Sequence, residues 1–118
     1  MRESTSLTQK HCEPCEGNTH PMTRPEAESY LRQTPGWEMD ASGKLISRSY
    51  RVKNFMTAVR FIQDIAGIAE AENHHPDLHL PGYHNVKIDL STHAIGGLSE
   101  NDFIVAAKVN ELKVELKT

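Results

Sequence analysis

The densest group of side chains that could carry out chemistry lies in the second half of the chain. Glu70, His74, His75 and Pro76 form one short run, and His93 follows later. Histidine is the side chain whose charge changes near neutral pH, and a carboxylate can act beside it. The chain's 7 histidines equal its aromatic residues in number, which are 1 Trp, 3 Tyr and 3 Phe. The sequence therefore favours acid–base or metal chemistry.

Glu70 and His74 are the first candidate pair. They lie four residues apart near the end of an expected long helix, so they share one face of that helix. A neighbouring carboxylate and the C-terminal end of a helix both stabilise a protonated imidazole. His74 is thus a candidate proton donor. A histidine at this position can also simply cap the last helix carbonyls.

The other candidates also have structural interpretations. Pro76 fixes the backbone after His75, so the two adjacent imidazoles are expected to point in different directions, although a single exposed linker histidine fits too. Strand alternation places His93 on the non-core face, where solvent or a ligand can reach it. Asp102 has capping-box spacing with Ser99, so we assign it mainly to that cap and secondarily to the site.

Metal binding is the competing explanation for the histidines. His75 and His79 have the spacing of two ligands on one helix, but Pro76 lies between them and interrupts a regular helix. Cys12 and Cys15 have zinc-ligand spacing near further histidines, yet a complete set of four ligands is not evident. We expect no bound metal, and we interpret the two cysteines as reduced thiols in a tail.

Length and composition narrow the class of protein further. The 118 residues suffice for one domain, and 37% hydrophobic with 25% charged residues is typical of a soluble globular chain. The formal net charge of -3 argues against a nucleic-acid surface, which needs clustered cations. We find no apolar run of membrane-spanning length and no signal peptide, so we expect a cytoplasmic protein without membrane contact.

The elements that must position the candidates follow from capping and periodicity. We expect a flexible tail over 1–22 that contains both cysteines, and a single domain over 23–118. A first helix begins at the Thr23 cap and stops at Pro35. A hairpin follows, with strands at 37–39 and 44–52.

A long helix is then expected after the Asn54 N-cap, followed by a hairpin of segments 77–80 and 85–92. The expected apolar stripe of this long helix comprises Phe55, Ala58, Val59, Ile62, Ile65, Ala66 and Ala69. A last helix runs from the Ser99 cap to about Lys117. The order α-β-β-α-β-β-α predicts an α+β fold, with a four-stranded antiparallel sheet and three helices packed on one face.

The residue types and their spacing also resemble the sequence signature of a known family. The run Glu70-x-x-x-His74-His75-Pro76, followed at set spacing by Tyr83, His93 and Asp102, is similar to the signature of the pterin-4a-carbinolamine dehydratases. The stretches 35–37, 53–55 and 92–99 resemble that family too, so the likeness covers about 23–116. The resemblance implies a hydro-lyase that converts 4a-hydroxytetrahydropterin to quinonoid dihydropterin in tetrahydrobiopterin recycling. It implies no metal and no organic cofactor.

The resemblance also implies roles for particular residues. His74 and His93 would be the acid/base pair, and His75 would orient the pterin. Glu70 would support His74. The substrate-binding residues would be Trp37, Glu70, Pro76, Thr92, Ala94 and Asp102. Without the resemblance, Trp37 is better explained as a core residue.

Partners form the last set of expectations. The resemblance implies a homodimer or homotetramer and a functional link to an aromatic amino acid hydroxylase. The alternative function is a protein-interaction module that acts as a dimerisation cofactor of a partner protein. Its surface would be the last helix, with Val105, Val109, Leu112 and Leu116. Asn101 departs from the basic residue of animal members, and the family supplies no role for the two cysteines.

Overall fold

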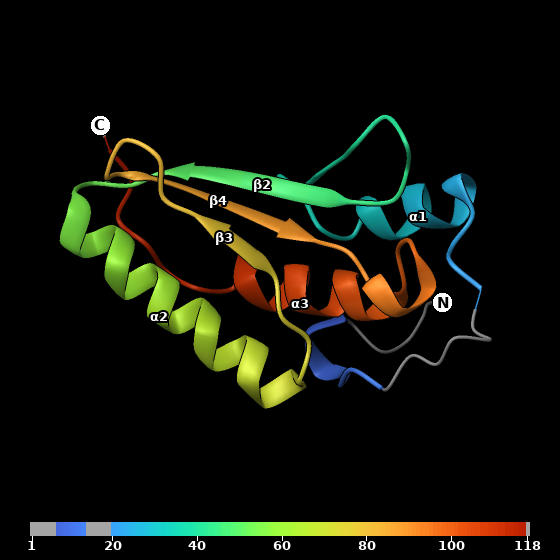
Figure 1. Ribbon diagram of the computed structural model, residues 1–118. Coiled ribbons are helices and arrows are strands. Elements are labelled where there is room, and N and C mark those ends of the chain that lie inside the picture. The colour runs from blue at the N-terminus through green and yellow to red at the C-terminus, as the bar shows by residue number, and fades with distance from the viewer. Residues whose placement is uncertain (1–6, 14–19, 118) are drawn as a thin grey trace.

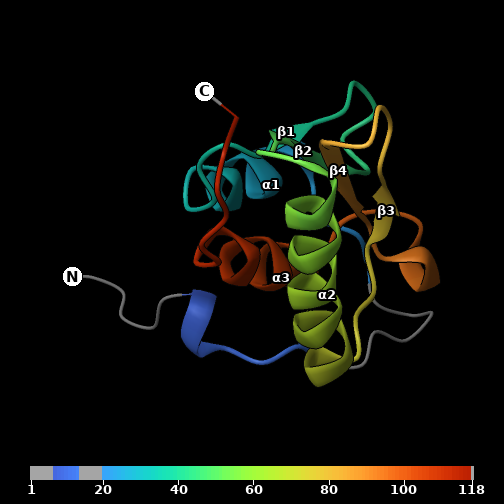
Figure 2. The same ribbon diagram turned by 90° about the vertical axis from the view of Figure 1, so that its left-hand side faces the viewer.

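A four-stranded antiparallel sheet with three α-helices forms the fold, as expected from the sequence (Figure 1). The computed structural model describes residues 7–13 and 20–117. In the described part of the chain, no helix is long and apolar enough to cross a membrane. Figure 2 shows α2 and α3 side by side beneath the sheet.

The helices begin where the capping residues predict. α1 (Arg24–Leu31) starts with a capping box between Thr23 and Glu26. α2 (Phe55–Glu72) starts after Asn54, whose side-chain oxygen accepts a hydrogen bond of 2.8 Å from the backbone N–H of Thr57. α3 (Glu100–Asn110) starts with a second capping box. Each cap satisfies N–H groups that the helix itself leaves unpaired.

The sheet consists of the two expected hairpins. β1 (Glu38–Met39) pairs with β2 (Ile46–Arg51), and β3 (Asp77–His79) pairs with β4 (Asn85–Leu90). β2 and β4 are the central pair, so the strand order is β1-β2-β4-β3. The inward side chains of the central strands are fully buried against the helices; they include Ile46, Val86, Ile88 and Leu90.

The last helix is shorter than expected. α3 ends at Asn110 and not near Lys117. The chain beyond it runs extended and pairs with the end of β2, where the N–H of Lys117 donates to the carbonyl of Arg51 at 3.0 Å. Leu116 is therefore in an isolated bridge and is 56% exposed. The helical spacing of apolar residues continues past residue 110. The backbone groups at the end of β2 need hydrogen-bond partners, however, and the C-terminal segment supplies them as an extended chain instead of a helix.

The buried face of α2 also differs from the expected stripe. The buried residues are Ala58, Phe61, Ile65, Ala69 and Glu72. Phe55, which we expected to be buried, is 49% exposed, and Ala66 is exposed. The helix has apolar residues over more than one stripe, so periodicity alone could not decide which stripe faces the core.

Part of the N-terminal segment packs on the domain. A short 3-10 helix, η1 (Leu7–Gln9), contacts α3, and Leu7 is only 4% exposed. Figure 2 shows η1 below α3, with the chain continuing toward the C-terminal end of α2. The sequence indicated little structure here because a single apolar residue carries the packing. Cys15 lies outside the described residues.

Candidate functional site

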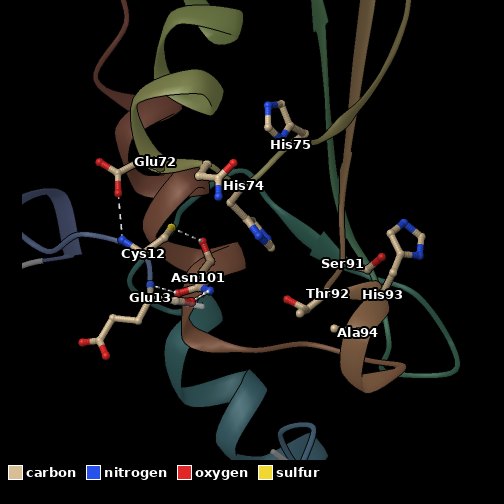
Figure 3. Close-up of a pocket in the computed structure, with 11 residues that line it drawn as sticks. Cys12, Glu13, Glu72, His74, His75, Ser91, Thr92, His93, Ala94 and Asn101 are labelled. Carbon is tan, nitrogen blue, oxygen red and sulfur yellow. Dashed lines mark hydrogen bonds between the residues drawn. The ribbon is translucent and has the colours of Figure 1, made fainter. Parts of the chain in front are cut away.

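A cavity of about 350 Å³ lies where the C-terminal end of α2, the segment after β4 and the first turn of α3 meet. Figure 3 shows its lining residues, with His74, His75 and His93 on three sides of one opening. The lining comprises Cys12, Glu13, Glu72, Asn73, His74, His75, Ser91, Thr92, His93, Ala94 and Asn101. In residues 7–13 and 20–117, no three metal-ligating side chains gather in one place.

The end of α2 aims the two adjacent histidines differently. Asn73 closes the helix in the left-handed conformation, with φ of 52°. Asparagine adopts this conformation more readily than most residues, so it is a common helix terminator. The N–H of His74 still donates to the carbonyl of Ala69 at 3.1 Å, while Pro76 leads the chain into β3. The turn takes both imidazoles off the regular helix face.

His74 is oriented by Asp102. Its Nε2 lies 2.7 Å from Oδ1 of Asp102, and this carboxylate is completely buried. The other oxygen, Oδ2, accepts hydrogen bonds from Oγ1 of Thr92 at 2.8 Å and from the N–H of Ser99 at 3.0 Å. Asp102 therefore caps α3, as expected, and also holds His74. Because a carboxylate accepts at Nε2, the Nδ1 of His74 is the nitrogen left for a ligand.

Glu70 pairs with His75 and not with His74. Oε2 of Glu70 lies 2.6 Å from Nε2 of His75, and both side chains are largely exposed. The expected support of His74 by Glu70 is therefore wrong for this structure. The i, i+4 rule applies within a regular helix, and Asn73 ends the helix before His74.

His93 is presented by a tight turn after β4. It opens η2 (His93–Ile95), and its exposed side chain lies across the cavity from His74 (Figure 3). The N–H of Thr92 donates to the carbonyl of Gly97 at 2.8 Å, which closes the turn. Gly96 has φ of 69°, a conformation that most other residues avoid. Thr92 and Ala94, the neighbours of His93 in the sequence, also line the cavity.

The other predicted site residues lie outside the lining. Trp37 is 4% exposed and donates from Nε1 to Oδ1 of Asn110 at 2.9 Å. Asn110 is the last residue of α3, whereas the cavity lies at the first turn of that helix, so the structure does not bring Trp37 to the cavity. Glu70 and Pro76 adjoin His75 without lining the cavity, and Asp102 lies behind His74.

Glu72 is the lining residue with the most unusual environment. Its side chain is 3% exposed, and its carboxylate accepts from Nζ of Lys108 at 2.6 Å and from the N–H of Cys12 at 2.7 Å. His11 also contacts it at 3.1 Å. Burial alone would raise the pKa of Glu72, but these hydrogen bonds lower it to about 2. Glu72 was not among the residues expected at the site, although an acidic residue three positions after Ala69, a member of the expected apolar stripe, was a usable signal.

Cys12, Glu13 and Asn101 were also missed. Burial is the main reason that the pKa of the Cys12 thiol is raised to about 12, and the Glu72 carboxylate adds to the effect. Cys12 is therefore a neutral thiol, which is a poor nucleophile and a poor metal ligand. Cys12 contacts Asn101, which lies 89 positions away in the sequence. Local sequence patterns carry no signal for a contact between such distant residues.

A small α+β domain whose cavity is bordered by imidazoles, one of them held by a buried carboxylate, has the groups that a general acid–base class of site requires. The comparison with known families is more specific. The family model for pterin 4 alpha carbinolamine dehydratase matches residues 20–112. The chain therefore belongs to the pterin-4a-carbinolamine dehydratase family, whose members are hydro-lyases.

Similar proteins agree with this membership. A mitochondrial pterin-4-alpha-carbinolamine dehydratase 2 of Arabidopsis thaliana is 51% identical over 92% of this chain, which spans 60% of that protein. A protein of Halorhodospira halophila named as a dehydratase of this type is 47% identical over 91% of this chain and 97% of its own. A crystal structure of a transcriptional coactivator/pterin dehydratase from Brucella melitensis has a TM-score of 0.72 at 34% identity, covering 77% of this chain and 96% of that one.

A more distant structure shares the fold alone. It is a pterin dehydratase-like protein described as a RuBisCO assembly factor in the alpha-carboxysome. Its TM-score is 0.54 at 18% identity, and the match covers 64% of this chain and 86% of that one.

Proposed function

We propose that this protein removes water from a 4a-hydroxytetrahydropterin to give a quinonoid dihydropterin, with His74 and His93 as the acid/base pair. The observation that carries the proposal is the fixed imidazole of His74, held at 2.7 Å by the buried Asp102 with Nδ1 left for a ligand. His93 lines the same cavity from the opposite side. Family membership supplies the substrate class.

The dehydration requires only proton donation and proton acceptance from the protein. The lone pair of a pterin ring nitrogen moves toward C4a as the bond between C4a and the hydroxyl oxygen breaks. One imidazolium gives its proton to the departing hydroxyl, which leaves as water, and the second imidazole accepts a proton from a ring N–H. General acid–base help of this kind contributes about 10²–10⁴-fold in rate. No nucleophile or metal takes part in these steps.

The neighbouring residues position this pair. Asp102 holds His74 in the tautomer that carries hydrogen on Nε2, so Nδ1 exchanges the proton. His75, itself paired with Glu70 at 2.6 Å, lies at the edge of the cavity, where it can orient the ring. The backbone around Thr92 and Ala94 offers further contacts with the pterin.

The test is a coupled assay in which an aromatic amino acid hydroxylase generates the carbinolamine. We expect His74→Ala and His93→Ala each to slow dehydration, and the double variant to approach the uncatalysed rate. His79→Ala is the matched control, because His79 also pairs with a carboxylate, Asp89 at 2.9 Å, but lies outside the cavity lining. Wild-type protein that does not accelerate loss of the carbinolamine would contradict the proposal.

We also propose that the protein acts in the cytoplasm beside an aromatic amino acid hydroxylase, which supplies its substrate. The carbinolamine is a reactive intermediate, so its formation and dehydration benefit from a shared compartment. A fractionation that places the hydroxylase and this protein in different compartments would contradict this part of the proposal.

A second candidate role, self-association or partner binding, rests on an exposed apolar surface. The last helix is not that surface, because Val105 and Val109 are completely buried. On α2, by contrast, Phe55 is 49% exposed and Met56 is 57% exposed. These two neighbouring apolar side chains are available for contact with a second protein surface. We therefore propose a homodimer or homotetramer, and sedimentation of a monomer at micromolar concentration would refute it.

A further inference from the structure

We propose that the N-terminal segment 7–13 forms a wall of the substrate-binding cavity and that Asn101 and Glu72 are positioning residues that hold this wall. The proposal rests on the dehydratase function proposed above. Cys12 and Glu13 line the same cavity as His74 and His93, although they belong to a segment distant in sequence. Figure 3 shows this segment crossing the side of the cavity next to His74.

The first attachment is the buried carboxylate of Glu72. Its Oε1 accepts from the backbone N–H of Cys12 at 2.7 Å, and its Oε2 is neutralised by Lys108 at 2.6 Å. A buried carboxylate is costly unless both oxygens are paired, so departure of the segment would leave Oε1 without this partner. Glu72 therefore favours the attached segment.

The second attachment is the side-chain amide of Asn101. Its Nδ2 donates to the carbonyl of Glu13 at 2.6 Å, and its Oδ1 accepts from the N–H of Glu13 at 3.1 Å. One side chain thus satisfies both backbone groups of a single residue, as a neighbouring β-strand would. The thiol of Cys12 donates to the backbone carbonyl of Asn101 at 3.6 Å. Together these contacts fix the position of Cys12 at the cavity.

The third attachment lies away from the cavity. Leu7 is 4% exposed and belongs to the hydrophobic core. Lys10 forms an ion pair of 2.6 Å with Glu100. Neither Leu7 nor Lys10 lines the cavity, so substitutions there change the wall only through the attachment of the segment.

The wall has a chemical character that suits a flat, neutral heterocycle. Cys12 contributes an uncharged thiol, and the neighbouring Glu72 carboxylate is already occupied by donors from the protein. Glu13 is held at the cavity by its backbone, and Figure 3 shows its carboxylate directed away from His74. The segment therefore adds packing surface next to His74 without placing a free charge there. We expect it to affect how tightly a pterin binds and not how fast the bound substrate reacts.

The experiment measures binding of 7,8-dihydrobiopterin to the full chain. The double variant Leu7→Ser with Lys10→Gln should raise the Kd about tenfold, the equivalent of one ~1.4 kcal/mol contact. In the coupled hydroxylase assay its KM should rise while kcat stays within about twofold, since the histidines are untouched. Asn101→Ala should likewise raise the Kd and KM and leave kcat within about twofold of wild type. Faster hydrogen exchange of the Cys12 and Glu13 amides confirms that the segment has detached.

Two substitutions that leave the N-terminal segment and the cavity lining untouched serve as controls. Lys53→Gln removes a comparable ion pair, with Glu115 at 3.3 Å, and Leu116→Ser removes an apolar residue of the C-terminal segment. Both should leave the Kd unchanged. An unchanged Kd in the detached double variant would overturn the proposal, as would a fall in kcat at constant KM. If wild-type protein binds no pterin, the proposed function itself fails, which is a different result.

A second measurement does not depend on any destabilising variant. In the Cys15→Ser protein, Cys12 is the single thiol. Saturating 7,8-dihydrobiopterin should slow its alkylation by iodoacetamide severalfold, because the ligand covers the wall. Alkylation at the same rate with and without bound ligand would contradict the placement of Cys12 at the substrate.

Discussion

The contact between His74 and Asp102 yields the most direct prediction, through the nearly isosteric substitution Asp102→Asn. The asparagine oxygen can still accept from Thr92 and Ser99, as Oδ2 of Asp102 does at 2.8 and 3.0 Å. Its NH₂ group then faces Nε2 of His74, where the carboxylate oxygen lay at 2.7 Å. An amide NH₂ can only donate, so Nε2 must become an acceptor and the ring proton moves to Nδ1.

The expected magnitude follows from this change of tautomer. A neutral His74 with hydrogen on Nδ1 cannot accept a proton there, and an imidazolium would have an N–H directed at the amide NH₂. We expect kcat to fall about 10²-fold, the lower end of the general acid–base contribution, which corresponds to ~2.7 kcal/mol in the barrier. KM should change little. The loss of charge-assisted hydrogen bonds should lower stability by about 1 kcal/mol, or ~4–8 °C in Tm.

The assay is the coupled hydroxylase reaction at saturating carbinolamine, with thermal unfolding measured in parallel. Asp89→Asn is the matched control, because Asp89 also accepts from a histidine, His79 at 2.9 Å, but this pair lies outside the cavity. A folded Asp102→Asn protein with kcat within twofold of wild type would refute the assignment of Nδ1 as the working nitrogen.

Three further predictions concern groups around the cavity. Glu70→Gln should lower kcat by no more than about threefold, since its pair with His75 is solvent-exposed; a hundredfold loss in the coupled assay would contradict this. The pKa of Glu72 is lowered from 4.5 to about 2, so its contribution to stability, about 3 kcal/mol, is complete above pH 4.5 and is lost as pH falls toward 2. The free energy of unfolding in urea should therefore be clearly lower for Glu72→Gln than for wild type at pH 7 and nearly equal at pH 2. A difference between the two proteins that does not change with pH would contradict the lowered pKa of Glu72. Because burial raises the pKa of Cys12 from 9.0 to about 12, its alkylation in the Cys15→Ser protein should be about a thousandfold slower than that of an exposed thiol; a rate typical of an exposed thiol would disprove its burial.

Sequence patterns predicted the features of this fold that are determined locally. The capping boxes at Thr23 and Ser99 and the N-cap at Asn54 each involve residues within four positions, and all three helices begin there. The two hairpins follow equally local turn and alternation signals. The end of α3 could not be predicted in this way, because Leu116 satisfies a helical stripe but pairs with the distant Val52.

The candidate site was predicted less completely than the fold, for a related reason. The left-handed φ of Asn73 changes the partner of His74 from Glu70, four positions away, to Asp102, twenty-eight positions away. A single backbone dihedral thus overrides a spacing rule. Cys12 is held at the cavity by contacts with residues distant in sequence, such as Glu72, sixty positions away. No periodic pattern in the sequence predicts such contacts.

The cavity has a further consequence because its lining comes from four separate stretches of chain, which include Cys12, His74, His93 and Asn101. Any partly unfolded state that releases one of these stretches also loses the binding site. Ligand binding and global folding are therefore thermodynamically linked. A ligand present at a hundred times its Kd stabilises the native state by about 2.7 kcal/mol. Cells that supply the pterin would in this way also slow the turnover of the protein that uses it.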